Sequence, residues 1–210
     1  MTGLDLLDHL VLATPDVAET RAWLEAATGI QPSIGGPHIE RGTCNALCSF
    51  GPDTYLEIIG PDPDQPEPVA PRPFGVDHVT EPTLVTWCAR PVDLDEYVQC
   101  AARVGVRYST PEAMSRQSPD GLLEWRLSFV ESDDHGGIVP FVIDWGATRH
   151  PAGSVTARLE LVSFEAGHPD PNQLPETLAG LGVALPVQKS ERPGLDAVVA
   201  GPAGLLQLRA

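Results

Sequence analysis

The feature that most constrains the fold of this chain is a helix pattern that recurs three times at equal spacing. Each copy opens with an Asp, carries Glu or Gln three residues later, continues as an amphipathic stretch and ends at a glycine. The copies run from Asp16 to Gly29, from Asp93 to Gly105 and from Asp170 to Gly182. The acid caps free N–H groups at the start of a helix, and glycine adopts the left-handed geometry that ends one. With strand-like runs around it, this repeat predicts β-α-β-β-β modules and a cup-shaped sheet.

The segments around these helices divide the 210 residues into three modules of one predicted domain. The modules cover residues 4–60, 83–146 and 156–210, and the proline-rich stretch 61–82 is predicted to be an extended linker. Residues 109–121 are polar and predict a long loop. We expect the first two modules to form the cup and the third to pack on it or complete it. A cup made by the first and third modules is the alternative.

The charge of the chain limits the classes of partner. Its formal net charge is −16, and such a surface repels phosphate backbones and anionic lipid, so neither nucleic acid nor membrane is an expected partner. The sequence shows no signal-peptide pattern and no run of roughly 20 apolar residues. We therefore expect a cytoplasmic protein that takes a small-molecule substrate or ligand. The oligomeric state stays open, with a homodimer as one alternative.

Several stretches of the sequence carry a family resemblance. They are LLDHLVLATPDVAETRAWLEAATG, the glycine-rich turn that follows it, TYLEIIGPDPD, and later SPDGLLEWRL with PFVIDW. These stretches resemble the vicinal oxygen chelate superfamily and, more narrowly, its glyoxalase-like domain proteins. The resemblance implies an α+β fold in which repeated β-α-β-β-β modules form a cupped mixed β-sheet, the glyoxalase/dihydroxybiphenyl dioxygenase-like fold. The superfamily includes lyases, isomerases, dioxygenases and ligand-sequestering proteins. We therefore expect a lyase or isomerase, with a metal-free binding protein as the alternative.

The resemblance also indicates where a metal would bind. In metal-binding relatives the ligands come from the first and last strands of each module and are typically His and Glu. The first module supplies His9 and Glu57, and the corresponding residues of the second are predicted to be Thr86 and Asp144. Three ligands are the usual minimum for a catalytic metal, and this donor set would suit Fe, Mn or Zn. Because Thr86 stands where a second His is expected, the metal-free form is preferred and Thr86 becomes a candidate substrate contact.

Two acids that interrupt apolar strands are the candidate catalytic groups. Glu57 lies in TYLEII and Asp144 in FVIDW, and burying a carboxylate is costly unless it is paired, metal-bound or protonated. If both face one hollow, one of them could act as the general base in a carboxylate-assisted proton transfer. The alternative is that each acid pairs with an arginine. His38, expected at the rim of the cup, is a further candidate base, with an ordinary loop histidine as its alternative.

Four more residues are candidate substrate contacts. Asn45 lies in a predicted buried strand, where both ends of its amide need partners. Arg126 can present its fork to the carboxylate of a ligand or of a neighbouring acid. Trp125 and Trp145 are predicted to wall an aromatic pocket, although large core residues pack in the same way.

Overall fold

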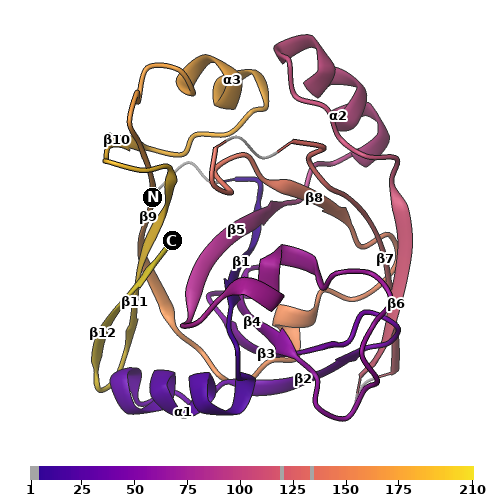
Figure 1. Ribbon diagram of the computed structural model, residues 1–210, viewed down its shortest axis with the longest axis vertical. Coiled ribbons are helices and arrows are strands. Elements are labelled where there is room, and N and C mark those ends of the chain that lie inside the picture. The colour runs from indigo at the N-terminus through magenta and orange to yellow at the C-terminus, as the bar shows by residue number, and fades with distance from the viewer. Residues whose placement is uncertain (1–4, 119–120, 133–134) are drawn as a thin grey trace.

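The computed structural model describes residues 5–118, 121–132 and 135–210, and the predicted start of the first module at Leu4 lies outside them. The element order repeats β-α-β-β-β three times (Figure 1). The first module contains β1 (Leu7–Ala13), α1 (Val17–Thr28), β2 (Ser33–His38), β3 (Thr43–Ser49) and β4 (Tyr55–Pro61). The second contains β5 (Thr83–Ala89), α2 (Leu94–Ala101), β6 (Glu112–Ser118), β7 (Gly121–Ser128) and β8 (Phe141–Asp144). The third contains β9 (Glu160–His168), α3 (Pro175–Gly180), β10 (Val187–Lys189), β11 (Gly194–Gly201) and β12 (Gly204–Arg209).

The first two modules share one mixed sheet of eight strands, in the order β2-β3-β4-β1-β5-β8-β7-β6. Strands β1 and β5 lie antiparallel at its centre, and each pairs in parallel with the last strand of its own module. The two edge strands approach each other, and Arg116 on β6 donates from Nη1 to the Gly35 carbonyl on β2 at 3.1 Å. The sheet therefore curls into a nearly closed cup, which confirms the predicted fold class and the pairing of the first two modules.

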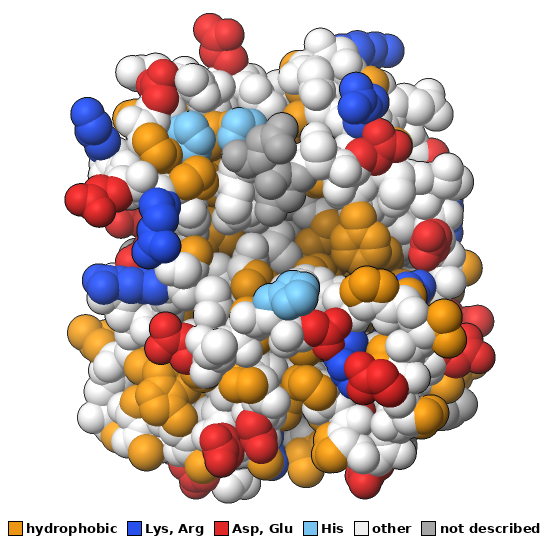
Figure 2. Space-filling model, viewed as in Figure 1, with side chains coloured by type: hydrophobic (Ala, Val, Ile, Leu, Met, Phe, Trp, Pro, Cys, Tyr) orange, Lys and Arg blue, Asp and Glu red, His pale blue; other side chains and the backbone are white. Residues whose placement is uncertain are grey.

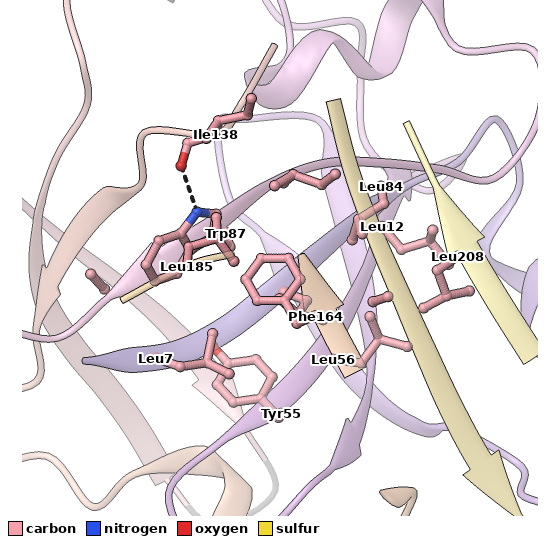
Figure 3. Packing of buried hydrophobic residues seen from close by; sticks show 14 of the residues in the cluster. Leu7, Leu12, Tyr55, Leu56, Leu84, Trp87, Ile138, Phe164, Leu185 and Leu208 are labelled. Carbon is pink, nitrogen blue, oxygen red and sulfur yellow. Dashed lines mark hydrogen bonds between the residues drawn. The ribbon is translucent and has the colours of Figure 1, made fainter. Parts of the chain in front are cut away.

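The third module forms a separate sheet in the order β10-β9-β11-β12, which lies beside β5 in Figure 1. The main apolar core fills the space between this sheet and the convex side of the cup. Figure 3 shows Trp87 and Leu84 packed with Phe164 and Leu208, and the Trp87 indole donates to the Ile138 carbonyl at 2.9 Å. Each large apolar side chain buried there contributes roughly 1.5–3 kcal/mol. The third module thus completes the core and leaves the cup to the other two.

The capping pattern is confirmed for the first two helices. The side chains of Asp16 and Asp93 each accept a hydrogen bond at 2.9 Å from the backbone N–H three residues further on. Gly29 follows α1 with φ of 76°, and Gly105 follows the short 3-10 helix η2 (Ala102–Val104) with φ of 81°. Both glycines adopt the left-handed conformation that L side chains disfavour.

The third helix starts later than the pattern predicts. It begins at Pro175, and Asp170 instead accepts a hydrogen bond from the Asn172 N–H in a turn. Proline is favoured at the first position of a helix because its fixed φ suits that place and no N–H is needed there. The acidic cap predicted at Asp170 is therefore wrong.

Two segments that the sequence predicts to be irregular help to build the cup. Within the predicted linker 61–82, the 3-10 helix η1 (Pro73–His78) buries Val76 and places Phe74 against the concave side. The loop predicted over 109–121 is wrong, because this stretch contains the whole of β6, which pairs with β7 as a hairpin. Its polar composition hides the strand, because one side of β6 is exposed and the inward side carries Met114 and Arg116. Another 3-10 helix, η3 (Pro151–Gly153), precedes β9.

Acidic side chains are spread over the face of the molecule shown in Figure 2, with basic ones interspersed. This pattern agrees with the net charge of −16. None of the helices in the described part of the chain combines the length and apolar character needed to cross a membrane.

Candidate functional site

The concave side of the cup encloses a cavity of about 90 Å³. Its polar wall comes from the first module and β6, and includes His9, His38, Arg41, Thr43, Asn45, Glu57 and Arg116. Its apolar wall comes mainly from β7, β8 and η1, and includes Phe74, Trp125, Leu127, Phe141, Ile143 and Trp145. Strand alternation decides which residues line the cavity, because successive residues of one strand face opposite sides. On β4, Tyr55, Glu57 and Ile59 face the cavity while Leu56 and Ile58 face the main core.

Glu57 is the acid of this cavity. Its side chain is buried, with 7% of the residue exposed, and Oε1 accepts a hydrogen bond from Asn45 Nδ2 at 2.6 Å. Oε2 accepts no hydrogen bond from the described residues, and His9 Nε2 lies 3.7 Å from it. That separation is too long for a hydrogen bond. One oxygen of Glu57 is therefore fixed while the other is left to meet a ligand.

Asn45 is held so that its amide N–H₂ points at Glu57. The Asn45 side chain lies against Gly35, and a Cβ atom at that glycine would overlap Asn45 Oδ1 and come within 2.9 Å of Cγ. The Oδ1 atom is buried without a hydrogen-bond partner among the described residues, which is an unfavourable state for an amide oxygen. The arrangement gives up one hydrogen bond at Asn45 and retains the one to Glu57.

His38 also belongs to this network. Asn45 Nδ2 lies 3.2 Å from His38 Nε2, and His38 Nδ1 lies 3.0 Å from Thr43 Oγ1. Because the amide N–H₂ can only donate, Nε2 must be the acceptor and the proton must sit on Nδ1 of a neutral ring. Burial lowers the pKa of His38, the Glu57 charge opposes this shift and the Arg116 charge adds to it. The Nε2 lone pair is thus already used, and His38 supports Asn45.

Asp8 is a site residue that the sequence reasoning missed. It is fully buried, and its Oδ1 lies 2.7 Å from Nδ1 of His9. Its Oδ2 accepts from Trp145 Nε1 at 3.1 Å, lies 3.1 Å from His150 Nε2 and is 3.5 Å from Nε of Arg90. Burial acts to raise the pKa of Asp8, but the hydrogen bonds and charges of His150 and His9 outweigh it and hold that pKa well below its usual value.

This contact fixes the state of His9. An ionised Asp8 accepts the Nδ1 proton, so neutral His9 carries its lone pair on Nε2, which faces the cavity. Tyr55 stacks on the imidazole with ring centroids 4.5 Å apart and holds its plane. The pairing of β1 with β5 is irregular between Leu7 and His9, and such a bulge re-aims side chains. This irregularity brings Asp8 beside its neighbour, although strict alternation would separate them.

Of the predicted site residues, Glu57, His38, His9, Asn45, Trp125 and Trp145 line the cavity, and their roles remain predictions. Asp144 does not line it. Its carboxylate accepts from the Gly146 N–H at 2.8 Å on the opposite face of β8, where Phe141 and Ile143 take the cavity side. The expectation that Asp144 and Glu57 share one hollow is therefore wrong.

The pairing register of the strands explains why Asp144 lies outside the cavity. Val11 pairs with Glu57 in the first module, and the equivalent pair in the second module is Cys88 with Phe141. Phe141, and not Asp144, thus occupies the position that corresponds to Glu57. An odd shift in register moves a side chain to the other face of a strand.

Arg126 and Thr86 also lie away from the cavity. The Arg126 guanidinium donates to both carboxylate oxygens of Asp95 on α2, at 2.9 and 2.7 Å, on an exposed surface. Thr86 is the structural counterpart of His9, but its hydroxyl donates to the Gly137 carbonyl at 3.4 Å beside a neighbouring hollow. Neither is placed to touch a ligand in the cup.

The residues of the cup do not fit the divalent metal that the fold suggests. Two of the four equivalent positions carry ligands, His9 and Glu57, while Thr86 and Phe141 supply none facing the cavity. Potential ligand atoms of Asp8, His9 and Cys88 lie within 4.8 Å of one another. Asp8 already accepts hydrogen bonds, and burial raises the pKa of the Cys88 thiol well above its usual value. A metal bound there would have to displace those donors and the thiol proton, because the thiolate is the ligand.

With this geometry in place, comparison with known proteins identifies the class. The family model of the glyoxalase-like domain matches residues 7–182, and the chain belongs to that family. Its fold is that of the vicinal oxygen chelate superfamily, as the resemblance of the sequence implied. A search of curated protein sequences finds no match.

Solved structures of similar fold include a hypothetical protein from Staphylococcus aureus, with a TM-score of 0.64, 15% identity, and coverage of 97% of this chain and 84% of that one. A methylmalonyl-CoA epimerase in complex with methylmalonyl-CoA and NH4+ has a TM-score of 0.50 and 18% identity over 70% of this chain and 99% of that one. The epimerase from Mycobacterium tuberculosis has a TM-score of 0.49 and 19% identity over 70% and 91%. Identities this low describe the fold alone.

Proposed function

We propose that this protein is an enzyme of the lyase or isomerase type that moves a proton on a small oxygenated molecule without a metal. The observation that supports this most is the pair of Glu57 Oε2 and His9 Nε2, 3.7 Å apart at one wall of a buried cavity. Asn45 supports the first group and Asp8 the second. General acid–base catalysis requires proton acceptors that neighbouring residues hold in position and that face the bound substrate, and both groups meet this requirement in the cavity.

The chemistry follows from this arrangement. Glu57 removes the proton from a carbon next to a carbonyl group, and the electron pair of the C–H bond passes to the carbonyl oxygen. The proton then returns to the same carbon or to a neighbouring one, which is an isomerisation, or a substituent leaves, which is an elimination. His9 can hold a proton on Nε2 during this sequence because the Asp8 carboxylate stabilises the resulting imidazolium.

Exchange of carbon-bound hydrogen with D₂O tests the proposal. Small carbonyl compounds are incubated with the protein, and NMR follows the loss of the C–H signal. We expect exchange with the unmodified protein and a loss of about 10²–10⁴-fold in Glu57→Gln, the range typical of general acid–base catalysis. Asp144→Asn, on the outer face of β8, is the matched control and should exchange normally.

Two results would contradict the proposal. One is exchange that persists unchanged in Glu57→Gln. The other is the absence of exchange for every carbonyl compound, together with tight binding of apolar molecules. The second result would favour the alternative of a metal-free ligand-binding protein, for which the aromatic wall with Trp125 and Trp145 is already suited.

A further inference from the structure

Arg116 is a buried cation that the proton-transfer site does not use. It lies on β6, lines the cavity and is only 6% exposed. Its Nη1 donates to the Gly35 carbonyl at 3.1 Å. A guanidinium has five N–H donors in a rigid fork, so one bond to a carbonyl leaves most of its hydrogen-bonding capacity for another partner.

The charge of Arg116 is not neutralised within the described residues. No carboxylate there lies within 4 Å of its guanidinium. Arg126 on the next strand shows the contrast, because it is exposed and still forms two bonds to Asp95. Burial lowers the pKa of Arg116, while Tyr55 and Glu57 oppose that shift. A charge held inside a protein without a paired anion is costly, so an anion that bound beside Arg116 would offset that cost.

Arg116 and Glu57 face the same cavity and do not form an ion pair. Glu57 Oε1 is turned to Asn45, and its charge reaches Arg116 only at longer range. Opposite charges therefore face one small space without a direct contact between them. A ligand that extends from Arg116 towards Glu57 and His9 would carry an anion at one end and the reacting carbon at the other.

The rest of the cavity sets the character of the ligand body. Phe74, Trp125, Phe141 and Trp145 form an aromatic wall, with the two indole rings 5.5 Å apart. A volume of about 90 Å³ has room for a body of a few carbon atoms or a single ring. The planar fork of arginine matches a carboxylate with two parallel hydrogen bonds.

We infer that the cup takes a compact carboxylic acid with an apolar body, its carboxylate held by Arg116 and its body against the aromatic wall. This inference rests on the proposed function only for the position of the reacting carbon. The carboxylate site itself stands on the cavity and on the buried guanidinium that faces it, which has no carboxylate partner among residues 5–118, 121–132 and 135–210.

Binding of a matched ligand pair tests the inference without any chemistry. Phenylacetate and phenylacetamide have the same body and differ in charge, and titration calorimetry gives both affinities. We expect phenylacetate to bind about 10- to 100-fold more tightly, the range for hydrogen bonds to a charged group. The preference should disappear in Arg116→Gln and persist in Arg126→Gln, which removes an exposed arginine on the neighbouring strand.

A second variant covers the case in which Arg116→Gln does not fold, since Arg116 joins the two edges of the cup. Arg116→Lys keeps the charge and loses the fork, so it should retain a reduced preference for the acid. Equal affinities for acid and amide in the unmodified protein would overturn the inference. An unchanged preference in Arg116→Gln, or no binding of either compound at millimolar concentration, would do the same.

Deuterium exchange separates this inference from the proposed function. Rates for α-ketobutyrate and methyl ethyl ketone are compared, each relative to its uncatalysed rate. If acids bind in a way that depends on Arg116 but no compound exchanges, the carboxylate site is supported and the proposed reaction is contradicted. If exchange is catalysed but favours neither compound, the reaction is supported and the carboxylate site is contradicted.

Discussion

Replacement of Asp8 by Asn tests whether the buried Asp8 carboxylate positions His9 and stabilises the fold. The fully buried carboxylate accepts from His9 and Trp145 and also contacts His150 and Arg90. An asparagine offers one acceptor oxygen and places N–H₂ against groups that are themselves donors. Breaking a buried charged network from one side costs about 3–5 kcal/mol, and we expect the lower end because Arg90, the one permanent cation, is 3.5 Å away.

For a chain of 210 residues, a loss of about 3 kcal/mol lowers Tm by roughly 6–12 °C. The loss should depend on pH. The pKa of Asp8 is lowered in the folded protein from an ordinary value of 3.8, so its contribution is complete above about pH 4 and is lost as pH falls towards the folded pKa. Denaturation of the variant and the unmodified protein at neutral pH and near pH 3 measures this directly.

The same variant should release the tautomer of His9, because Asp8 would no longer fix the proton on Nδ1. The ¹⁵N NMR signals of the imidazole and the rate of exchange record that change, which a purely structural role would leave alone. Asp144→Asn is the control, since asparagine can still accept from the Gly146 N–H. Equal stability of the Asp8 and Asp144 variants at neutral pH, with the His9 tautomer unchanged, would refute the reasoning.

Three other predictions follow from the same network. Gly35→Ala should displace the Asn45 side chain and slow exchange by about 10-fold or more, and Asn45→Ala should have the same effect. The double variant should show no further loss, and additive losses would contradict the shared cause. The pKa of His38 is lowered from 6.5 in the folded protein, so its contribution to stability is complete above that pH and is lost as pH falls. The urea midpoints near pH 5 and pH 7 should therefore differ less in His38→Gln than in the unmodified protein. An equal difference in the two proteins would count against burial of His38 as the cause. Exhaustive EDTA treatment should leave exchange unchanged, and a stoichiometric metal whose removal abolishes exchange would disprove the metal-free site.

Local signals in the sequence predicted much of the fold. The caps at Asp16 and Asp93 depend on side chains three residues apart, and the glycines that end those helices depend on one backbone angle each. Glu57 could be found because a carboxylate in an apolar strand is costly to bury. These features are decided by near neighbours along the chain, which a single sequence displays directly.

Features that depend on strand pairing could not be predicted in this way. The position of Asp144 required the register of β8 against β5, and that register places Phe141 inward. The role of Asp8 required a bulge between β1 and β5, and that of Arg116 required β6 to meet β2. Each of these contacts joins residues distant in sequence, and no local pattern marks them.

The third module limits where this chain can be truncated. The matched family region ends at residue 182, but β11 and β12 follow it and bury Leu195, Val199 and Leu208 in the main core. The Ala203 N–H also bonds to the Thr28 carbonyl at the end of α1 at 2.9 Å. A fragment that stops at residue 182 would expose the apolar back of the cup to water and should aggregate, even with every residue of the cavity intact.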